Sequence, residues 1–421
     1  MIEKPKYGIM AKVAVLCIIV IQYTVTISSP LLGVIAQQYP QYPILVKQIE
    51  TIPTLAAIIP SLLIGPLNKY MTKKNMLLLG TVLAFAQFVP AIVPGFWPLY
   101  ISRFVAGLGL GFMYSFAASF IVDMFDGAEQ NMMMGLRSAV GAIAGIIFMQ
   151  ISGSIAVRTG SYQKSFMVAL VLIPIFLIEL FCMPKTNPIE EANRAAARSP
   201  KSKAGESKEK NFTGLTWAFI VMTVVNILFA YTFMSNAAII TCAPVEAGGL
   251  GMDASKAAMV MSVFSGAMAV SGFIFGPVWM RLFKNFTTAV GITFCFIGLV
   301  ICYLSGSFAV MVAGALIYGF GFQIYNGAIC LLLPLTSRPQ AATTIIAVFF
   351  AFQNLGSFLA TVITPNISKA LFPGQLKGDW KVAIVGLLIC AVIYFILCRK
   401  ADARAKRVFG SEPAGSGEAT E

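Results

Sequence analysis

Two charged residues lie within stretches of sequence that are otherwise apolar. Arg103 stands in the run LYISRFVAGLG (99–109), and Glu50 opens the apolar stretch 49–67. An arginine inside a bilayer costs roughly 2.5–3.5 kcal/mol on insertion scales, so its side chain is expected to face other helices. Counted from Pro98 at about 1.5 Å per residue, Arg103 lies about 7–8 Å into a helix. It is a candidate for gating or coupling; the alternative is an outward-reaching side chain or one that binds a backbone carbonyl.

Glu50 is expected on the same side of the membrane as Arg103, and it is a candidate partner for Arg103 in an ion pair. A carboxylate at the start of a helix also interacts favourably with the positive end of the helix dipole. The sequence leaves both interpretations of Glu50 open.

Arg137 lies near the start of the apolar stretch 133–156, shortly after Asp123, Asp126 and Glu129. Opposite charges this close in sequence, at the end of two neighbouring spans, favour a network of ion pairs at the membrane surface. We therefore expect Arg137 to take part in gating contacts between helices and not to touch a solute.

The other candidates are amides and tyrosines in apolar stretches, which can hydrogen-bond either a solute or a neighbouring helix. They are Gln22, Tyr23, Tyr114, Asn226, Tyr231, Asn236, Tyr318, Gln323, Tyr325, Asn326, Gln353 and Asn354. The run QIYN (323–326) is the strongest cluster, because it places amides on two faces of one helix. We expect no charged group in mid-membrane besides Arg103 and Glu50. Such groups suit an amphipathic or weakly anionic organic solute.

Catalytic and metal chemistry are not expected. The chain has no histidine, and its eight cysteines include no CxxC pair. No nucleophile–base pair stands out, so the sequence predicts no enzyme, no metal and no cofactor. A GxxxxGK[ST] loop is also missing from the sequence, which excludes ATP-driven transport by this chain alone.

The composition is that of a membrane protein. Charged residues make up 11% of the chain, hydrophobic residues 58%, and the mean hydropathy is +0.83, whereas soluble domains are roughly 25% charged. The net charge of +13 resides in short segments between apolar stretches. This pattern follows membrane topology and does not indicate nucleic-acid binding.

Twelve apolar stretches are long enough to span a bilayer, which takes about 20 residues. They are 13–36, 49–67, 75–96, 98–122, 133–156, 163–183, 213–241, 256–279, 286–305, 307–333, 340–365 and 380–398. This predicts a first six-helix bundle over 1–184, a polar linker over 185–211 and a second bundle over 212–400. The remainder, 401–421, is predicted to be a disordered tail.

The distribution of basic residues predicts the orientation. With the amino terminus inside, 21 of the 30 Lys and Arg lie on that side and seven on the other. By the positive-inside rule, both termini and the linker are expected in the cytoplasm of a multi-pass protein of the cell (inner) membrane.

The two halves of the chain repeat one another. Gly65-Pro66 and Gly276-Pro277 each begin a basic turn between apolar stretches, and they are 211 residues apart. Three further glycine pairs follow at shifts of 211 or 212 residues: Gly80 and Gly291, Gly107 and Gly319, Gly145 and Gly356. Four matches in order indicate duplication of one unit, and membrane proteins built this way often bind their solute between the copies.

The loop GPLNKYMTKK (65–74) resembles the loop between spans two and three of the major facilitator superfamily. In that family the loop reads Gly, any residue, Leu, a variable residue, Asp and then basic residues. Gly65 and Leu67 fit, as do the lysines, while Asn68 is the polar residue nearest to the place of the acid. An amide brings no charge to a helix dipole, so the latch that this loop forms in the family is expected to be weaker or differently built here.

Two further segments carry the resemblance. Arg103, four residues before Gly107, is similar to a motif of proton-coupled members. Gly141 and Gly145 keep the glycine spacing found in span five of drug-exporting antiporters, but the Gly-Pro pair of those antiporters is missing.

The resemblance covers nearly the whole chain and implies an all-α membrane protein with 12 transmembrane helices in two pseudo-symmetric six-helix bundles. It also implies a monomeric secondary transporter that moves a small organic solute by alternating access, around a cavity lined by spans one, four, seven and ten. Efflux of amphipathic compounds and transport of an organic anion both stay open, as does coupling to protons. A transport-inactive sensor or receptor on the same fold is the alternative.

Overall fold

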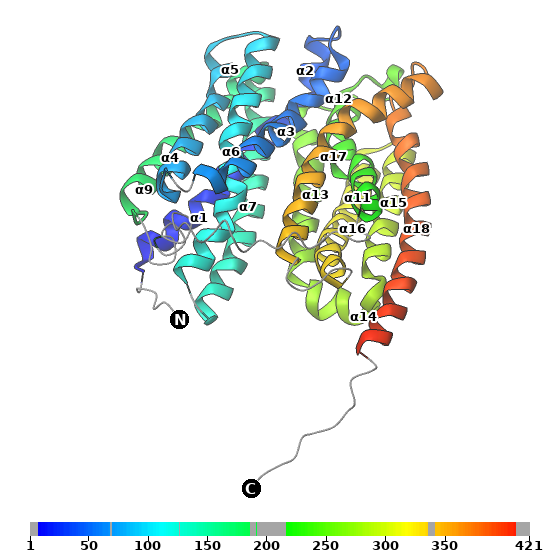
Figure 1. Ribbon diagram of the computed structural model, residues 1–421. Helices are drawn as coiled ribbons and strands as arrows, with labels where there is room; N and C mark the ends of the chain where they lie inside the picture. Colours follow the sequence, from blue (N-terminus) through cyan, green and yellow to red (C-terminus); the bar gives the residue numbers. More distant parts are fainter. Residues whose placement is uncertain are drawn as a thin grey trace.

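Figure 1 shows a computed structural model of the chain, which describes residues 7–67, 70–125, 127–185, 191, 216–335 and 342–409. Every regular element in these residues is a helix. Eleven helical segments are long and apolar enough to cross a membrane. The 30-residue helix α17 (Ala342–Leu371) takes the place of the remaining expected span. The prediction of an all-helical membrane protein is confirmed.

The first half contains the helices that correspond to spans one to six. They are α1 (Ile9–Tyr23), η1 (Thr24–Leu31), α2 (Leu32–Gln38), α3 (Pro43–Leu67), α4 (Lys73–Ala84), η2 (Phe85–Phe88), α5 (Val89–Ile92), α6 (Phe96–Met124), α7 (Gly127–Thr159), α8 (Tyr162–Ser165), η3 (Phe166–Val171) and α9 (Leu172–Cys182). Spans one, three and six therefore each contain a 3-10 segment between α-helical parts.

The second half supplies spans seven to twelve. Its elements are α11 (Thr216–Leu228), α12 (Ala230–Cys242), η5 (Val245–Ala247), α13 (Ala254–Phe273), the π-helical η6 (Phe275–Met280), α14 (Arg281–Phe283), η7 (Lys284–Phe286), α15 (Thr287–Leu304), α16 (Phe308–Leu335), α17 and α18 (Gly378–Phe409). In Figure 1 α14 lies at the end of the molecule where α18 finishes, and α2 and α5 lie at the opposite end. We refer to these as the α14 end and the α2 end.

The first span is not the continuous helix expected over 13–36. It changes to a 3-10 helix at Thr24, and Pro30 lies inside this segment. The hydroxyls of Thr24 and Thr26 each donate to a carbonyl three residues earlier. Proline removes a backbone donor, and hydroxyls that bind the preceding turn compete with the regular helical bonds. The sequence of η1 thus favours an interrupted helix in the membrane interior.

The internal repeat is visible as matching glycine contacts. A Cβ atom added at Gly109 of α6 would lie 2.3 Å from the carbonyl oxygen of Gly80 in α4. In the second half, a Cβ atom at Gly321 of α16 would lie 2.7 Å from the carbonyl oxygen of Gly291 in α15. Each pair lets two helix backbones approach closely, which stabilises helix association where lipid provides no hydrophobic drive.

A second contact is repeated in the same way. An added Cβ atom would meet Pro53 O at Gly107 and Phe264 O at Gly319, at 2.5 and 2.4 Å. Pro53 and Phe264 are themselves 211 residues apart. The packing of α3 on α6 is therefore reproduced by that of α13 on α16.

The last helix extends into the segment that was predicted to be a tail. Helix α18 continues to Phe409, because the segment ADARAKRVF (401–409) is rich in Ala, Arg and Lys, which favour helices. Residues 410–421 and most of the predicted linker, 186–190 and 192–211, lie outside the described residues. The limits of the two bundles stay a prediction.

We predict that Gly109→Ala lowers the thermal unfolding midpoint of the purified protein. The added methyl group would meet backbone atoms of α4, which no side-chain rotation can relieve, and overpacking of this kind costs about 1–3 kcal/mol. Gly266→Ala in α13 is the matched control, since the nearest atom to its Cβ is Ile146 Cδ1 at 3.9 Å. Equal midpoints for the two variants would contradict the close approach of α4 and α6.

Candidate functional site

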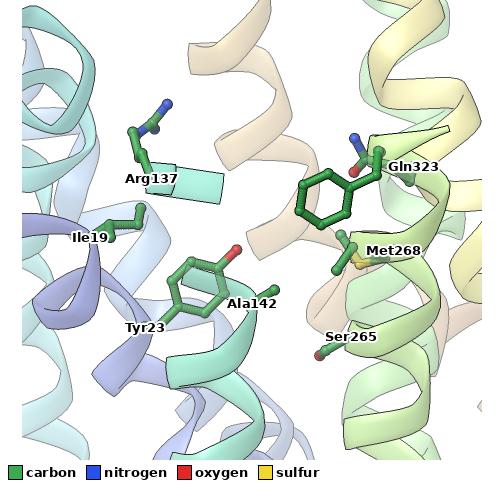
Figure 2. A pocket seen from close by; sticks show the side chains of 10 residues that line it. Ile19, Tyr23, Arg137, Ala142, Ser265, Met268 and Gln323 are labelled. Atoms are coloured by element: carbon green, nitrogen blue, oxygen red, sulfur yellow. The ribbon is translucent and has the colours of Figure 1, made fainter. Parts of the chain in front are cut away.

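A cavity of about 450 Å³ lies between the two halves. Figure 2 shows side chains from both halves facing this space. The lining residues are Ile19, Tyr23, Arg137, Ala142, Ser265, Met268, Ala269, Gly272, Phe273 and Gln323. The volume falls in the range of pockets that hold small organic molecules, about 300–1,000 Å³.

The walls of the cavity differ from those expected. Spans one and ten contribute through α1 and α16, but the other lining residues come from span five (α7) and span eight (α13). Spans four and seven supply none of the described lining residues. The reason is how α7 and α13 cross: Gly153 packs on Ala254 and Ala258, and Gln150 Nε2 donates to Ser262 Oγ at 2.9 Å. The turns of α7 and α13 that lie between this contact and the α14 end face the cavity.

Arg137 is the only charged residue among the described lining residues. Its Nε atom is buried and has no hydrogen-bond partner in the described part of the chain. Two acids of the predicted surface network have other partners: Asp123 pairs with Lys73 of α4 and Glu129 pairs with Lys12 of α1. Asp126 lies outside the described residues. Two lysines from other helices thus take the acids that the sequence placed beside Arg137.

Tyr23, at the end of α1, is held in the cavity wall by α7. A Cβ atom at Gly141 or Gly145 would lie 2.6 or 2.7 Å from the ring of Tyr23. In Figure 2 the phenol of Tyr23 lies across the cavity from Gln323 and below Arg137. The GxxxG pair noted in span five therefore makes room for an aromatic side chain at the cavity.

Three other predicted residues are linked to this region. Tyr114 of α6 is hydrogen-bonded to Gln22 of α1, and Tyr231 of α12 is hydrogen-bonded to Ser357 of α17. Tyr23, Tyr114 and Tyr231 also lie within range of one another's electrostatic interaction. They bring hydroxyls from both halves toward the centre of the protein.

The remaining candidates make contacts between or within helices. Asn226 and Asn236 donate to carbonyls of Met222 and Thr232, one turn earlier in their own helices. Tyr318 stacks on Phe233, and Tyr325 stacks on Phe229 with its hydroxyl 3.4 Å from that of Tyr394. Gln353 donates to Asn326 Oδ1 at 2.9 Å, and Asn354 is half-buried on α17. None of these side chains lines the cavity.

Arg103 does not form the expected ion pair with Glu50. The guanidinium, which is fully buried, donates to Val25 O at 2.8 Å, Ile49 O at 3.1 Å and Gln87 Oε1 at 2.7 Å. Two of these acceptors are backbone carbonyls, as in the alternative interpretation of Arg103. Gln87 in turn donates to Thr24 Oγ1 at 2.7 Å.

Glu50 binds the same 3-10 segment from α3. Its carboxylate accepts hydrogen bonds from Ser28 Oγ at 2.8 Å and Ser29 Oγ at 2.7 Å, and its side chain is 2% exposed. Arg103 is close enough to interact with it electrostatically. Both charges are thus connected through η1 and not through a direct contact.

The α2 end is closed by polar contacts between the halves. Lys47 of α3 forms an ion pair with Asp379 of α18, and these side chains are 15% and 8% exposed. Thr51 and Thr361 hydroxyls are 3.0 Å apart, and Gln37 Nε2 donates to Cys242 O at 2.9 Å. The described contacts between the halves therefore cluster on the α2 side of the cavity.

The loop after α3 makes its described contacts within the first half. Asn68 lies outside the described residues, and Gly65 is part of the last turns of α3. Lys73 pairs with Asp123, and Lys74 donates to the carbonyls of Leu180 and Met183. A gating role for Gly65 and Asn68 stays a prediction.

Sequence reasoning missed two kinds of residue. Ser265 and Met268 line the cavity from α13, and no signal in their small or apolar surroundings marks them. Glu179 is fully buried in α9, and it was not among the predicted residues. A single acid in the apolar run LIPIFLIELFC was the signal that could have found it.

Two pseudo-equivalent sets of helices around a central cavity are the architecture of a membrane transporter of the alternating-access type. The family model described as Major Facilitator Superfamily matches residues 14–361. The chain belongs to this superfamily and is a non-enzymatic transporter by that membership.

Solved structures agree with this fold. The nucleoside transporter NupG is 14% identical with a TM-score of 0.72, covering 92% of this chain and 99% of its own. The peptide transporter POT is 12% identical with a TM-score of 0.72, covering 95% and 97%. The xylose transporter XylE from E. coli, in a partially occluded inward open conformation, is 12% identical with a TM-score of 0.66, covering 98% and 99%. No curated protein sequence matches the chain significantly.

We predict that Thr51→Cys combined with Thr361→Cys forms a disulfide between the halves. Hydroxyls 3.0 Å apart place the two side chains within reach of disulfide geometry. The variant is made without the native cysteines and with a protease site in the segment 192–215, so that an oxidised, cleaved sample stays one species on a denaturing gel. Each single cysteine variant should separate into two fragments. Separation of the oxidised double variant would show that the α2 end is not closed as described.

Proposed function

We propose that this transporter moves a small organic anion across the membrane by alternating access. The supporting observation is the position of Arg137: it is the one cation among the described lining residues, and no carboxylate shares that wall. In a cavity of low dielectric constant, a guanidinium whose buried Nε has no partner among the described residues favours a negatively charged partner. A neutral amphipathic compound would leave this charge uncompensated.

The rest of the lining supports an organic body on the anion. Tyr23, Gln323 and Ser265 offer hydrogen bonds, while Met268 and Phe273 offer apolar contact. Mostly apolar walls with a few placed polar groups are typical of small-molecule sites. We infer a carboxylate, sulfonate or phosphate ester of modest size as the solute class.

Alternating access is supported by the uneven distribution of contacts. The halves meet at the α2 end through Lys47–Asp379 and Thr51–Thr361, and the cavity lies on the other side of the α7–α13 crossing. We infer that the α14 end faces the cytoplasm, because the positive-inside count places the basic segments there. In this state the solute site would be reached from the cytoplasm.

We also propose that transport is coupled to protons through Glu50. Glu50 is a buried carboxylate that binds η1 and lies near Arg103. The segment η1 joins α1, which lines the cavity, to α2 at the closed end. Protonation of Glu50 would weaken its charge-assisted bonds with Ser28 and Ser29. A proton could thereby change the position of η1 and the balance between the two open states.

Arg137→Ala should weaken binding of the anion about 10- to 100-fold, because a hydrogen bond to a charged group contributes about 1.5–3 kcal/mol. The anion is first chosen as the compound that most raises the unfolding temperature in a screen of carboxylates, sulfonates and phosphate esters. Arg137→Lys should retain part of the affinity, since the charge stays.

Arg158→Ala, at an exposed position of the same helix, is the matched control and should bind like the unaltered protein. Uptake into proteoliposomes then separates transport from sensing, because a sensor would bind the anion without moving it. Unchanged affinity in Arg137→Ala would refute the proposal that the solute is an anion bound by Arg137. It would not contradict the transporter fold.

Glu50→Gln should abolish accumulation driven by a pH gradient in proteoliposomes while anion exchange continues. The amide imitates a permanently protonated carboxyl, so the solute can still cross but no proton is released or bound at this position. Glu246→Gln, on the exposed element η5, should accumulate normally. Undiminished gradient-driven accumulation in Glu50→Gln would exclude Glu50 as the coupling group.

A further inference from the structure

A second buried carboxyl group lies outside the cavity and outside the η1 network. Glu179 of α9 has an exposed fraction of 0%, and its Oε2 atom lies 2.6 Å from Thr81 Oγ1 of α4. Its other oxygen, Oε1, is buried and has no hydrogen-bond partner among the described residues. Nothing in the proposed function uses this group.

No cation of the described residues is directed at the carboxyl group of Glu179. Cys17 of α1 interacts electrostatically with Glu179 and with Cys182 of α9. Lys74, two turns before Thr81 on α4, directs its ammonium group to the carbonyls of Leu180 and Met183 instead. The ion pairs of the described residues do not include Glu179. An ionised carboxylate would thus be buried with one donor and no counter-ion, which is strongly unfavourable.

The hydrogen bonds around Thr81 are better satisfied by a neutral acid. Thr81 Oγ1 also lies 3.1 Å from Leu77 O, and a hydroxyl has a single proton to donate. When Glu179 is protonated, its O–H donates to Thr81 Oγ1 and the Thr81 O–H donates to Leu77 O. Both contacts are then real hydrogen bonds, and Oε1 is left as an uncharged carbonyl oxygen.

We propose that Glu179 is a proton-binding site held as the neutral carboxylic acid, and that it is the carboxyl group of this chain that reacts with hydrophobic carbodiimides. This inference does not depend on the proposed function. Glu50 is the internal contrast: Ser28 Oγ and Ser29 Oγ lie 2.8 and 2.7 Å from its two carboxylate oxygens and Arg103 is near, so an ionised Glu50 has the partners that Glu179 lacks.

A cavity on the lipid side of the bundle lies next to Thr81, the hydrogen-bond partner of Glu179. This cavity of about 480 Å³ between α4, α6 and α9 is lined by Thr81 and by apolar residues such as Val82, Phe85, Ile173 and Phe176. Val82 and Ile173 are 55% and 47% exposed, so the cavity opens on the outer face of the bundle. Two lining residues are neighbours of Glu179: Phe176 lies one turn before it on α9, and Thr81 is its hydrogen-bond partner on α4.

The reaction is an addition in which nothing is lost. The acid proton moves to one carbodiimide nitrogen while a carboxyl oxygen bonds to the central carbon, giving an O-acylisourea. Transfer of the acyl group to the neighbouring nitrogen then yields a stable N-acylurea that retains the full mass of the reagent. Only a protonated carboxyl group reacts readily, so labelling reports the protonation state.

The test is to treat the full-length protein in lipid nanodiscs with N,N′-dicyclohexylcarbodiimide and to locate the adduct by mass spectrometry. We expect the adduct on Glu179, at least ten times less on Glu50, and none at position 179 in Glu179→Gln. A water-soluble carbodiimide should label the exposed Glu246 and leave Glu179 unmodified. Preferential labelling of Glu50 over Glu179 would overturn the assignment.

An infrared difference spectrum gives a second readout that does not depend on reagent access. The unaltered protein minus Glu179→Gln should show the carbonyl band of a protonated carboxylic acid at neutral pH. Thr81→Val should keep this band, shifted by loss of the hydrogen bond. A carboxylate band in place of the acid band would refute the proposal even if no adduct formed.

Discussion

The structure depends on how the polar groups of the unwound segment η1 find hydrogen-bond partners in the membrane interior. A helix that changes to 3-10 geometry at Thr24 and contains Pro30 leaves backbone groups without their regular partners, and lipid offers none. Arg103, Gln87 and Glu50 come from three other elements and bind Val25 O, Thr24 Oγ1 and the hydroxyls of Ser28 and Ser29. The irregular backbone of η1 is therefore a sufficient structural reason for the buried charges. A role of these charges in transport would act through the same contacts with η1.

This arrangement connects the cavity to the closed end. Tyr23, whose ring lies in the cavity wall against Gly141 and Gly145, immediately precedes η1. Gln37, near the end of α2, binds Cys242 O across the halves. A change in the charge of the η1 network would act on both neighbours, because α1, η1 and α2 are one continuous span. The coupling that we propose would thus have a covalent path and would need no chain of distant contacts.

The features predictable from the sequence are those set by local length and spacing. Apolar stretches gave the spans, and the repeated glycines at Gly80 and Gly291 mark real backbone contacts. The partners of charged side chains were not predictable, because they depend on which distant helices meet. Arg137 was assigned to nearby acids, but Lys73 and Lys12 pair with Asp123 and Glu129 and leave it facing the cavity. The Thr, Ser and Pro content of η1 was the available signal for its unwinding.

The two halves share a scaffold but differ in what fills it. At shifts of 211 and 212 residues, Glu50 and Arg103 correspond to Met261 and Ala315, both fully buried. The second half is instead held by stacked aromatic rings, such as Phe233 on Tyr318. Close-packed aromatic cores resist small rearrangements, whereas a network of charge-assisted bonds changes strength with a single proton. The contacts that a single proton would strengthen or weaken therefore lie in the first half at these positions, whereas the matching positions of the second half are apolar.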